Sequence, residues 1–210
     1  MPKFQAVAFD FDGVLADTTS LHVDAWNSTL SKFGIDRSIS ANDILGLSVR
    51  EFAESLDIEQ RLVGPVIASK SELVRGIATI RPPELYAHVA STLKNLHCRY
   101  RLAVVSVGEK AVVLSTVRHF DIESLFDLFV LEGDYTQPKP HPEPYNVCVS
   151  RLQLEPEEVA AIEDSPAGIE AAKAAGLFVI AVSTSAALDK LQQADHVIDH
   201  IGQISNFMPI

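Results

Sequence analysis

The 210-residue sequence has little of what marks membrane-spanning, secreted or nucleic-acid-binding proteins. No apolar stretch approaches the roughly 20 residues that a membrane-spanning helix needs. Met1-Pro2-Lys3 leads directly into an apolar run, so we expect no signal peptide. The two cysteines, Cys98 and Cys148, lack metal or redox spacing, and we expect free thiols in a reducing cytoplasm.

Positive charge is also scarce, because 17 Lys and Arg stand against 28 Asp and Glu, a formal net charge of −11. This balance argues against nucleic acid and anionic membranes as partners. It would also repel a phosphorylated ligand at long range, so any phosphate site must be locally positive. The hydrophobic fraction of 47% is that of an ordinary globular protein with a substantial core.

Apolar runs alternate with helical patterns from residue 101 onward, which predicts a Rossmann-like α/β fold with a doubly wound parallel sheet. We expect its strands at residues 102–105, 128–131, 159–162, 178–182 and 196–198, and intervening helices at residues 110–119, 144–152 and 169–175. The apolar run at residues 4–9 would add a first strand to the same sheet.

An all-helical insertion separates the first predicted strand from the second. Apolar residues keep helical spacing over residues 21–33, which Gly34 ends, and over residues 40–80. Pro82-Pro83 breaks the pattern, and a further helix is expected at residues 84–96. We therefore predict an α/β core at residues 1–16 and 81–210 and a helical cap domain at residues 17–80, with hinges near residues 16–18 and 81–83.

Asp10 and Asp12 stand at the end of the first predicted strand, just before a turn at Gly13. Ligands of open parallel sheets bind outside the carboxyl ends of the strands. Two neighbouring carboxylates repel each other unless a cation lies between them or one holds a proton. The pair thus indicates a metal site or a nucleophile with an acid/base partner, unless it is a solvated turn. An EF-hand does not fit, because glycine comes fourth instead of sixth and no helix precedes the pair.

Polar residues also follow the later predicted strands: Ser106 with Gly108, Lys139, and Glu163-Asp164. Each alone could be a helix cap or a solvated charge, and the Pro-rich run around Lys139 could be a polyproline ligand. Together they would meet at one edge of the sheet and supply a nucleophile, a hydroxyl donor, a cation and metal ligands. This joint arrangement favours an active site.

These residues resemble the four motifs of the haloacid dehalogenase superfamily of phosphotransferases, which appear in order as Asp10-Phe11-Asp12-Gly13-Val14, Ser106, Lys139-Pro140 and Ile162-Glu163-Asp164-Ser165. Other residues are similar to the branch that contains β-phosphoglucomutase and small phosphosugar or phosphoglycolate phosphatases, namely Asp17-Thr18, His22, Ala25-Trp26, Gly46-x-Ser48 and Ala167-Gly168-Ile169-Glu170-Ala171-Ala172. The similarity covers essentially the whole chain.

The resemblance implies a role for each motif residue. Asp10 would attack phosphorus to form an aspartyl-phosphate, and Asp12 would protonate the leaving oxygen and then activate water. Ser106 and Lys139 would hold the transferring phosphoryl oxygens. The helix that starts after Gly108 would add backbone amide donors for the same anion.

The resemblance also implies Mg²⁺ as the cofactor, since hard cations prefer oxygen ligands. The ion would be held by Asp10, the backbone carbonyl of Asp12, and Asp164. Glu163 would lie beside these ligands or contact a metal-bound water.

The helical insertion would act as a lid that closes over the pocket and excludes water. His22, Ser48 and Arg50 are its candidate substrate-binding residues, and Lys70 is a fourth polar residue of interest. A solvated helix face remains the alternative for each of them.

The chain departs from the family pattern at positions that bear on specificity. In the mutase branch a basic residue precedes the lid glycine and an Arg follows the lid serine, whereas this chain has Leu45 and Val49 there. Arg50 comes one residue later, which turns its side chain by about 100° on a helix. Val107 also replaces the small polar residue that usually follows the motif serine.

We therefore expect a Mg²⁺-dependent phosphoric monoester hydrolase that acts on a small phosphorylated metabolite, of the sugar phosphate or phosphoglycolate type. We expect it to be a monomer or a weak homodimer in the cytoplasm. The alternatives are a β-phosphoglucomutase-like phosphosugar mutase and a catalytically silent binding protein on the same fold. A dehalogenase is disfavoured, because that chemistry does not need an acid/base residue at Asp12.

Overall fold

The computed structural model describes residues 4–44 and 49–208, and its centre is a six-stranded parallel sheet. In spatial order the strands are β5 (Leu128–Val130), β4 (Arg101–Val105), β1 (Ala6–Phe9), β6 (Val159–Glu163), β7 (Phe178–Val182) and β8 (His196–Ile198). The first strand β1 pairs with β4 on one side and with β6 on the other. The predicted doubly wound α/β fold is confirmed.

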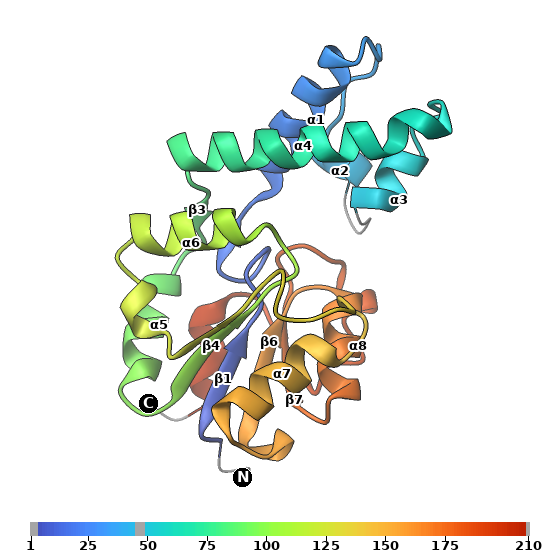
Figure 1. Ribbon diagram of the computed structural model, residues 1–210. Coiled ribbons are helices and arrows are strands. Elements are labelled where there is room, and N and C mark those ends of the chain that lie inside the picture. The colour runs from blue at the N-terminus through green and yellow to red at the C-terminus, as the bar shows by residue number, and fades with distance from the viewer. Residues whose placement is uncertain (1–3, 45–48, 209–210) are drawn as a thin grey trace.

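Helices cover both faces of this sheet (Figure 1). Val7 and Phe9 of β1 pack toward α5 (Val89–His97) and α6 (Lys110–His119), whereas Ala6 and Ala8 pack toward α7 (Glu143–Leu152) and α8 (Pro166–Ala174). A strand that is buried on both faces needs apolar residues throughout, which explains the uninterrupted apolar run. Short 3₁₀ turns complete the core at η1 (Glu123–Leu125), η2 (Pro156–Glu158), η3 (Leu188–Lys190) and η4 (Ile201–Asn206).

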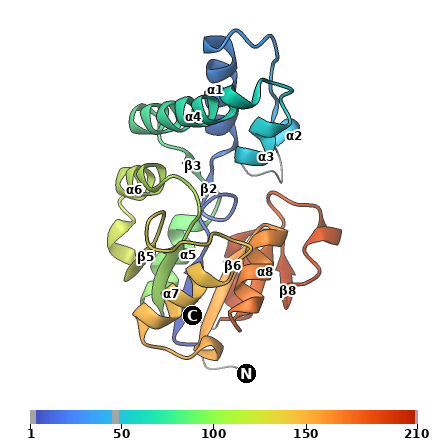
Figure 2. The same cartoon turned by 45° about the vertical axis from the view of Figure 1, so that its right-hand side comes forward.

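Four helices form a separate layer beyond the carboxyl ends of the strands (Figures 1 and 2). This helical layer consists of α1 (Thr19–Lys32), α2 (Ala41–Ile44), α3 (Val49–Glu54) and α4 (Gln60–Ile80). It has its own apolar cluster, in which the rings of Trp26 and Phe52 lie 4.6 Å apart. Helical spacing over residues 40–80 predicted helices in this stretch, and its described residues, 40–44 and 49–80, contain three helices.

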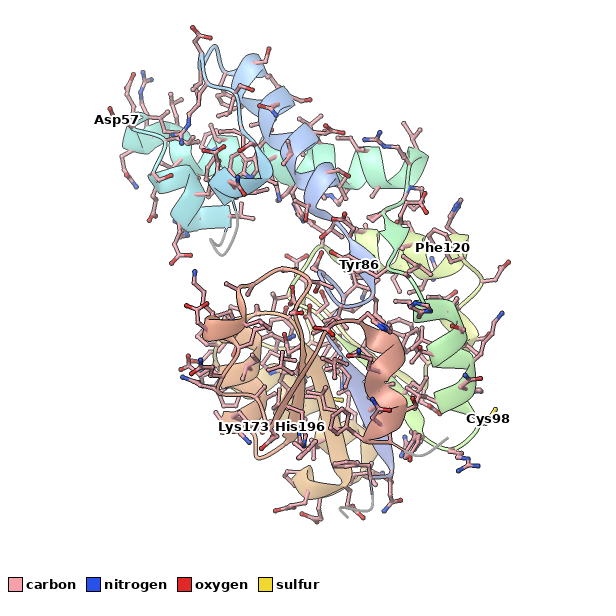
Figure 3. All side chains as sticks on the ribbon, turned by 180° about the vertical axis from the view of Figure 1, so that it is seen from behind. Asp57, Tyr86, Cys98, Phe120, Lys173 and His196 are labelled. Atoms are coloured by element: carbon pink, nitrogen blue, oxygen red, sulfur yellow. The ribbon has the colours of Figure 1, made fainter. Side chains whose placement is uncertain are left out.

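Two very short strands join the helical layer to the sheet. β2 (Ala16–Asp17) pairs antiparallel with β3 (Glu84–Leu85), and the N–H of Tyr86 donates to the carbonyl of Leu15 at 3.1 Å. Figure 3 shows Tyr86 at this junction. The prediction that a helix begins at Glu84 was wrong, because Glu84 and Leu85 make strand hydrogen bonds and α5 begins only at Val89.

Cys98 is exposed, Cys148 is buried, and both are free thiols, as expected from their spacing. Within the described residues, no helix combines the length and the apolar character that crossing a membrane requires.

Candidate active site

The polar residues at the strand ends meet at one edge of the sheet, because parallel strands bring their carboxyl ends together. Asp10 follows β1, Ser106 follows β4, and Glu163 ends β6 with Asp164 directly after it. Lys139 reaches the same place from the loop between β5 and α7. All of these side chains are buried in an otherwise apolar core.

The ammonium of Lys139 is the cation at the centre of this group. Its Nζ donates to Asp10 Oδ1 at 2.6 Å, to Glu163 Oε1 at 2.6 Å and to the carbonyl of Val105 at 2.8 Å. Burial lowers the pKa of Lys139, but the charges of Asp10 and Glu163 outweigh it and raise this pKa above its usual value. Lys139 is therefore a fixed positive charge beside the Asp10 carboxylate.

Asp10, Glu163 and Asp164 form an acidic cluster in which one oxygen of each residue lies within 4.8 Å of the others. Burial raises the pKa of Asp10 well above its usual value, although Lys139 opposes this. Burial and then the charge of Glu163 raise the pKa of Asp164 to about 7. When all three carboxyl groups are ionised, they and the Lys139 ammonium have a formal charge of −2, which a divalent cation with oxygen ligands would balance. The donor set therefore fits Mg²⁺.

The side chain of Asp12 lies outside this cluster. Its Oδ1 accepts a hydrogen bond from Thr18 Oγ1 at 2.6 Å, and its Oδ2 accepts one from Ser106 Oγ at 3.3 Å. The N–H of Gly108 donates to Ser106 Oγ at 2.9 Å, and a Cβ on Gly108 would overlap the Asp12 carboxylate. The loop after β4 can approach Asp12 this closely only because residue 108 is glycine.

Gly13 allows a second close approach. Its φ is +80°, a conformation that residues with a Cβ rarely adopt, and a Cβ there would overlap the carboxylate of Asp164. The turn predicted at Gly13 thus brings the backbone after Asp12 against the acidic cluster.

The helical layer contributes a basic pair that faces the core, in which Lys70 is buried and His22 is half-buried. Lys70 of α4 is only 1% exposed, and its Nζ lies 2.8 Å from Nδ1 of His22 on α1. Burial lowers the pKa of Lys70 to about 8, while the charges of Glu109 and Asp12 oppose it. Burial, aided by the charge of Lys70, lowers the pKa of His22 to about 4. At neutral pH the pair is an ammonium that donates to a neutral imidazole.

The other two candidate residues of the helical layer are not part of this pair. Arg50 lies on α3 with its side chain 70% exposed, and it forms an i,i+4 ion pair with Glu54 at 3.4 Å. Ser48 lies outside the described residues.

Tyr145 is a residue of the site that the sequence reasoning missed. It is fully buried, its hydroxyl donates to Glu163 Oε1 at 2.6 Å, and its ring lies 4.9 Å from the Lys139 ammonium. A tyrosine on the apolar face of a helix was the available signal, since a buried phenol needs a hydrogen-bond partner. Its partner is the acidic residue that also holds Lys139.

The fold and the site define an α/β protein with a buried acidic centre and one lysine at the carboxyl edge of a parallel sheet. The family model described as haloacid dehalogenase-like hydrolase matches residues 7–182. The chain therefore belongs to the haloacid dehalogenase-like hydrolases, as the motif resemblance predicted.

Named relatives cover most of the chain. The protein is 27% identical to fructose-1-phosphate phosphatase YqaB of Escherichia coli over 86% of this chain and 97% of the relative. It is 32% identical to a phosphorylated carbohydrates phosphatase of Thermotoga maritima over 82% of each chain. It is 29% identical to β-phosphoglucomutase of Bacillus subtilis over 85% of this chain and 83% of the relative.

Solved structures share the fold. CbbY from Rhodobacter sphaeroides, in complex with phosphate, has a TM-score of 0.82 at 24% identity over 96% of both chains. The protein is thus an enzyme of the haloacid dehalogenase-like hydrolases, and its phosphatase relatives are consistent with the hydrolysis of phosphoric monoesters.

Proposed function

We propose that the protein is a Mg²⁺-dependent phosphatase that hydrolyses a small phosphorylated metabolite through an aspartyl-phosphate on Asp10. The observation that carries this proposal is the Asp10 carboxylate, which the Lys139 ammonium holds at 2.6 Å inside the acidic cluster. Relatives named as phosphatases of fructose 1-phosphate and of phosphorylated carbohydrates favour a sugar phosphate as the substrate class. Phosphoglycolate is the other class that we propose to test.

In the first step, a carboxylate oxygen of Asp10 attacks phosphorus, and the bond from phosphorus to the leaving oxygen breaks. Asp12 acts as the general acid and gives a proton to that oxygen, so that the product leaves as a neutral alcohol. Lys139 and Ser106 lie beside these two carboxyl groups and stabilise the charge on the phosphoryl oxygens.

In the second step, the Asp12 carboxylate takes a proton from water, and the water oxygen attacks phosphorus. The bond between phosphorus and Asp10 breaks, inorganic phosphate leaves, and Asp12 is protonated again. The hydrogen bonds from Thr18 and Ser106 keep the carboxyl group of Asp12 in one place for both proton transfers.

Asp10, Asp164 and the backbone carbonyl of Asp12 would hold Mg²⁺, with Glu163 beside them. The bound ion supplies Lewis-acid polarisation of the phosphoryl oxygens and offsets the negative charge of the carboxylates. Lys139 alone does not neutralise the cluster, since it is one cation among three buried carboxylates.

We also propose that residues 17–80 form a lid on a core of residues 1–16 and 81–210. The paired strands β2 and β3 are the two connections between these parts, so bending there would move the helical layer as a unit. Lys70 and His22 face the core and would contact the polar groups of the substrate when the lid is closed.

A phosphosugar mutase is the second candidate, because one relative is a β-phosphoglucomutase. A mutase must hold a second phosphate and keep water from the phosphorylated enzyme. Val49 stands where the mutase branch has Arg, and the side chain of Arg50 is exposed and paired with Glu54. Net hydrolysis is therefore the reaction that the described residues support best.

The test is release of inorganic phosphate from sugar phosphates, phosphoglycolate and nucleotides, with Mg²⁺ or with EDTA. We expect release that requires Mg²⁺ and that disappears in Asp10→Asn. Asp121→Asn is a matched control, because Asp121 is exposed and has φ 53°, which Asn tolerates.

Two results would contradict the proposal. The first is release that continues at full rate in EDTA or in Asp10→Asn. The second is conversion of β-glucose 1-phosphate to glucose 6-phosphate with little free phosphate, which would establish the mutase instead.

A further inference from the structure

One ion pair joins the helical layer to the loop that carries Ser106. Nη1 of Arg75, on α4, lies 3.1 Å from Oε2 of Glu109, which directly precedes α6. Glu109 also follows Gly108, whose N–H donates to Ser106. The Glu109 side chain is only 15% exposed, in contrast to 50% for Arg75, so its carboxylate is largely withdrawn from water.

The charge of Glu109 acts on several basic side chains of the helical layer. It pairs with Arg75, and it raises the pKa of Lys70 against the effect of burial. It raises the pKa of His22 in the same way, together with Asp12. Arg75, Lys70 and His22 come from α1 and α4, whereas Glu109 comes from the core. Glu109 is thus an acidic residue of the core whose charge, like that of Asp12, acts on the basic residues of the helical layer.

A phosphate far from the reacting centre is bound most strongly by cations that have no carboxylate partner. In this protein Glu109 pairs with Arg75 and partly offsets the positive charge of Lys70. A second phosphate that entered between the helical layer and the core would have to displace this carboxylate or lie beside it, and like charges repel.

We propose that Glu109 is a specificity-determining residue that selects substrates with a single phosphate and rejects bisphosphates. A hydroxyl of the substrate can donate to the Glu109 carboxylate, while a second phosphate cannot. This inference rests on the proposed phosphatase function, because it concerns the part of the substrate that lies away from Asp10.

An ion pair that served only to hold the helical layer against the core would give a different result in binding measurements. Removing either partner would then have the same effect on binding, and that effect would not depend on the number of phosphates. The specificity role predicts opposite effects: Glu109→Gln frees Arg75 and Lys70 for a second phosphate, whereas Arg75→Gln leaves the Glu109 carboxylate unpaired.

The test compares the binding of fructose 1-phosphate and fructose 1,6-bisphosphate, which differ by one phosphate, by titration calorimetry with Mg²⁺. The measurements use the full chain with Asp10→Asn, so that turnover does not interfere. Glu123→Gln is the matched control, because it also removes a carboxylate from an ion pair with an arginine. Glu123 pairs with Arg118 at 3.0 Å, and both side chains are exposed and belong to the core.

The measured quantity is the ratio of the affinity for the bisphosphate to the affinity for the monophosphate. We expect Glu109→Gln to raise this ratio about tenfold, because one charge-assisted contact has an effect of about this size. We expect Arg75→Gln to lower this ratio and Glu123→Gln to leave it unchanged. An unchanged ratio in Glu109→Gln, or a change in the same direction in both variants, overturns the proposal. Either result leaves the phosphatase proposal standing, since that proposal is decided by phosphate release from the unmodified protein.

Discussion

Gly168 offers a direct test of how Glu163 is held, because the helix at this glycine packs against the Glu163 carboxylate. Gly168 lies in the first turn of α8, after the N-cap Ser165, and a Cβ there would overlap the carboxyl group of Glu163. That group is fully buried and accepts hydrogen bonds from Lys139 and Tyr145, so it has little freedom to move. Gly168→Ala should therefore displace Glu163 and disturb Lys139.

The expected magnitude is the difference between two effects. Replacing Gly by Ala inside a helix is worth about 0.8–1 kcal/mol of stability when nothing obstructs the new methyl group. A hydrogen bond to a charged group contributes about 1.5–3 kcal/mol, and displacing Glu163 breaks at least one. The loss exceeds the gain, so we expect the free energy of unfolding of Gly168→Ala to be about 0.5–2 kcal/mol below that of the unmodified protein.

Gly76→Ala is the matched control. Gly76 is exposed in α4, and a Cβ there would meet nothing within 4 Å. Urea unfolding followed by circular dichroism gives both free energies, with a stabilisation of about 0.8–1 kcal/mol expected for Gly76→Ala. Equal stabilisation by both substitutions would refute the placement of Glu163 against α8.

Replacing Lys70 by Met should raise KM about tenfold in steady-state kinetics, since it removes a buried ammonium that faces the core. Because the pKa of Lys70 is about 8, its charge is present below that pH and lost above it. The value of kcat/KM should therefore fall as the pH rises through about 8, and Lys70→Arg should remove this fall. Tyr145→Phe should lower kcat about tenfold with an unchanged circular dichroism spectrum, because Glu163 loses a donor. Asp164→Ala should weaken Mg²⁺ binding in calorimetry about tenfold or more.

A specific result would contradict each of these predictions. An unchanged KM in Lys70→Met would remove Lys70 from the substrate contacts, and a flat pH profile would show that its charge is not needed. Wild-type kcat in Tyr145→Phe would make the tyrosine a packing residue only. Full Mg²⁺ affinity in Asp164→Ala would move the metal away from the acidic cluster.

Much of the core could be predicted from the sequence, because its strands are buried on both faces. Such strands are uninterrupted apolar runs, and the predicted limits of residues 178–182 and 196–198 agree with β7 and β8. The convergence of Asp10, Ser106 and Lys139 followed from the rule that parallel strands end at one edge. The types of these side chains then indicated an active site, because together they supply a nucleophile, a hydroxyl donor and a cation.

The helical layer was harder to predict, because side-chain directions there depend on how helices cross. Lys70 was a polar residue of interest for which a solvated helix face was the alternative, and the packing of α1 against α4 buries it beside His22. Arg50 was predicted as a substrate contact with the same alternative, and its side chain is exposed beside Glu54. The strand at Glu84–Leu85 was missed because two residues show no periodicity, and only their pairing with Ala16 and Asp17 defines them.

The central claim is that Asp10 carries the phosphoryl group, and acid quenching of the enzyme during turnover tests it most directly. Borohydride reduction of an aspartyl-phosphate leaves homoserine, which tandem mass spectrometry of the peptides can locate. We expect homoserine at position 10 in the presence of substrate and Mg²⁺, and none when EDTA replaces Mg²⁺. Phosphate release by an active preparation in which Asp10 is never modified, or modification of another residue instead, would contradict the mechanism.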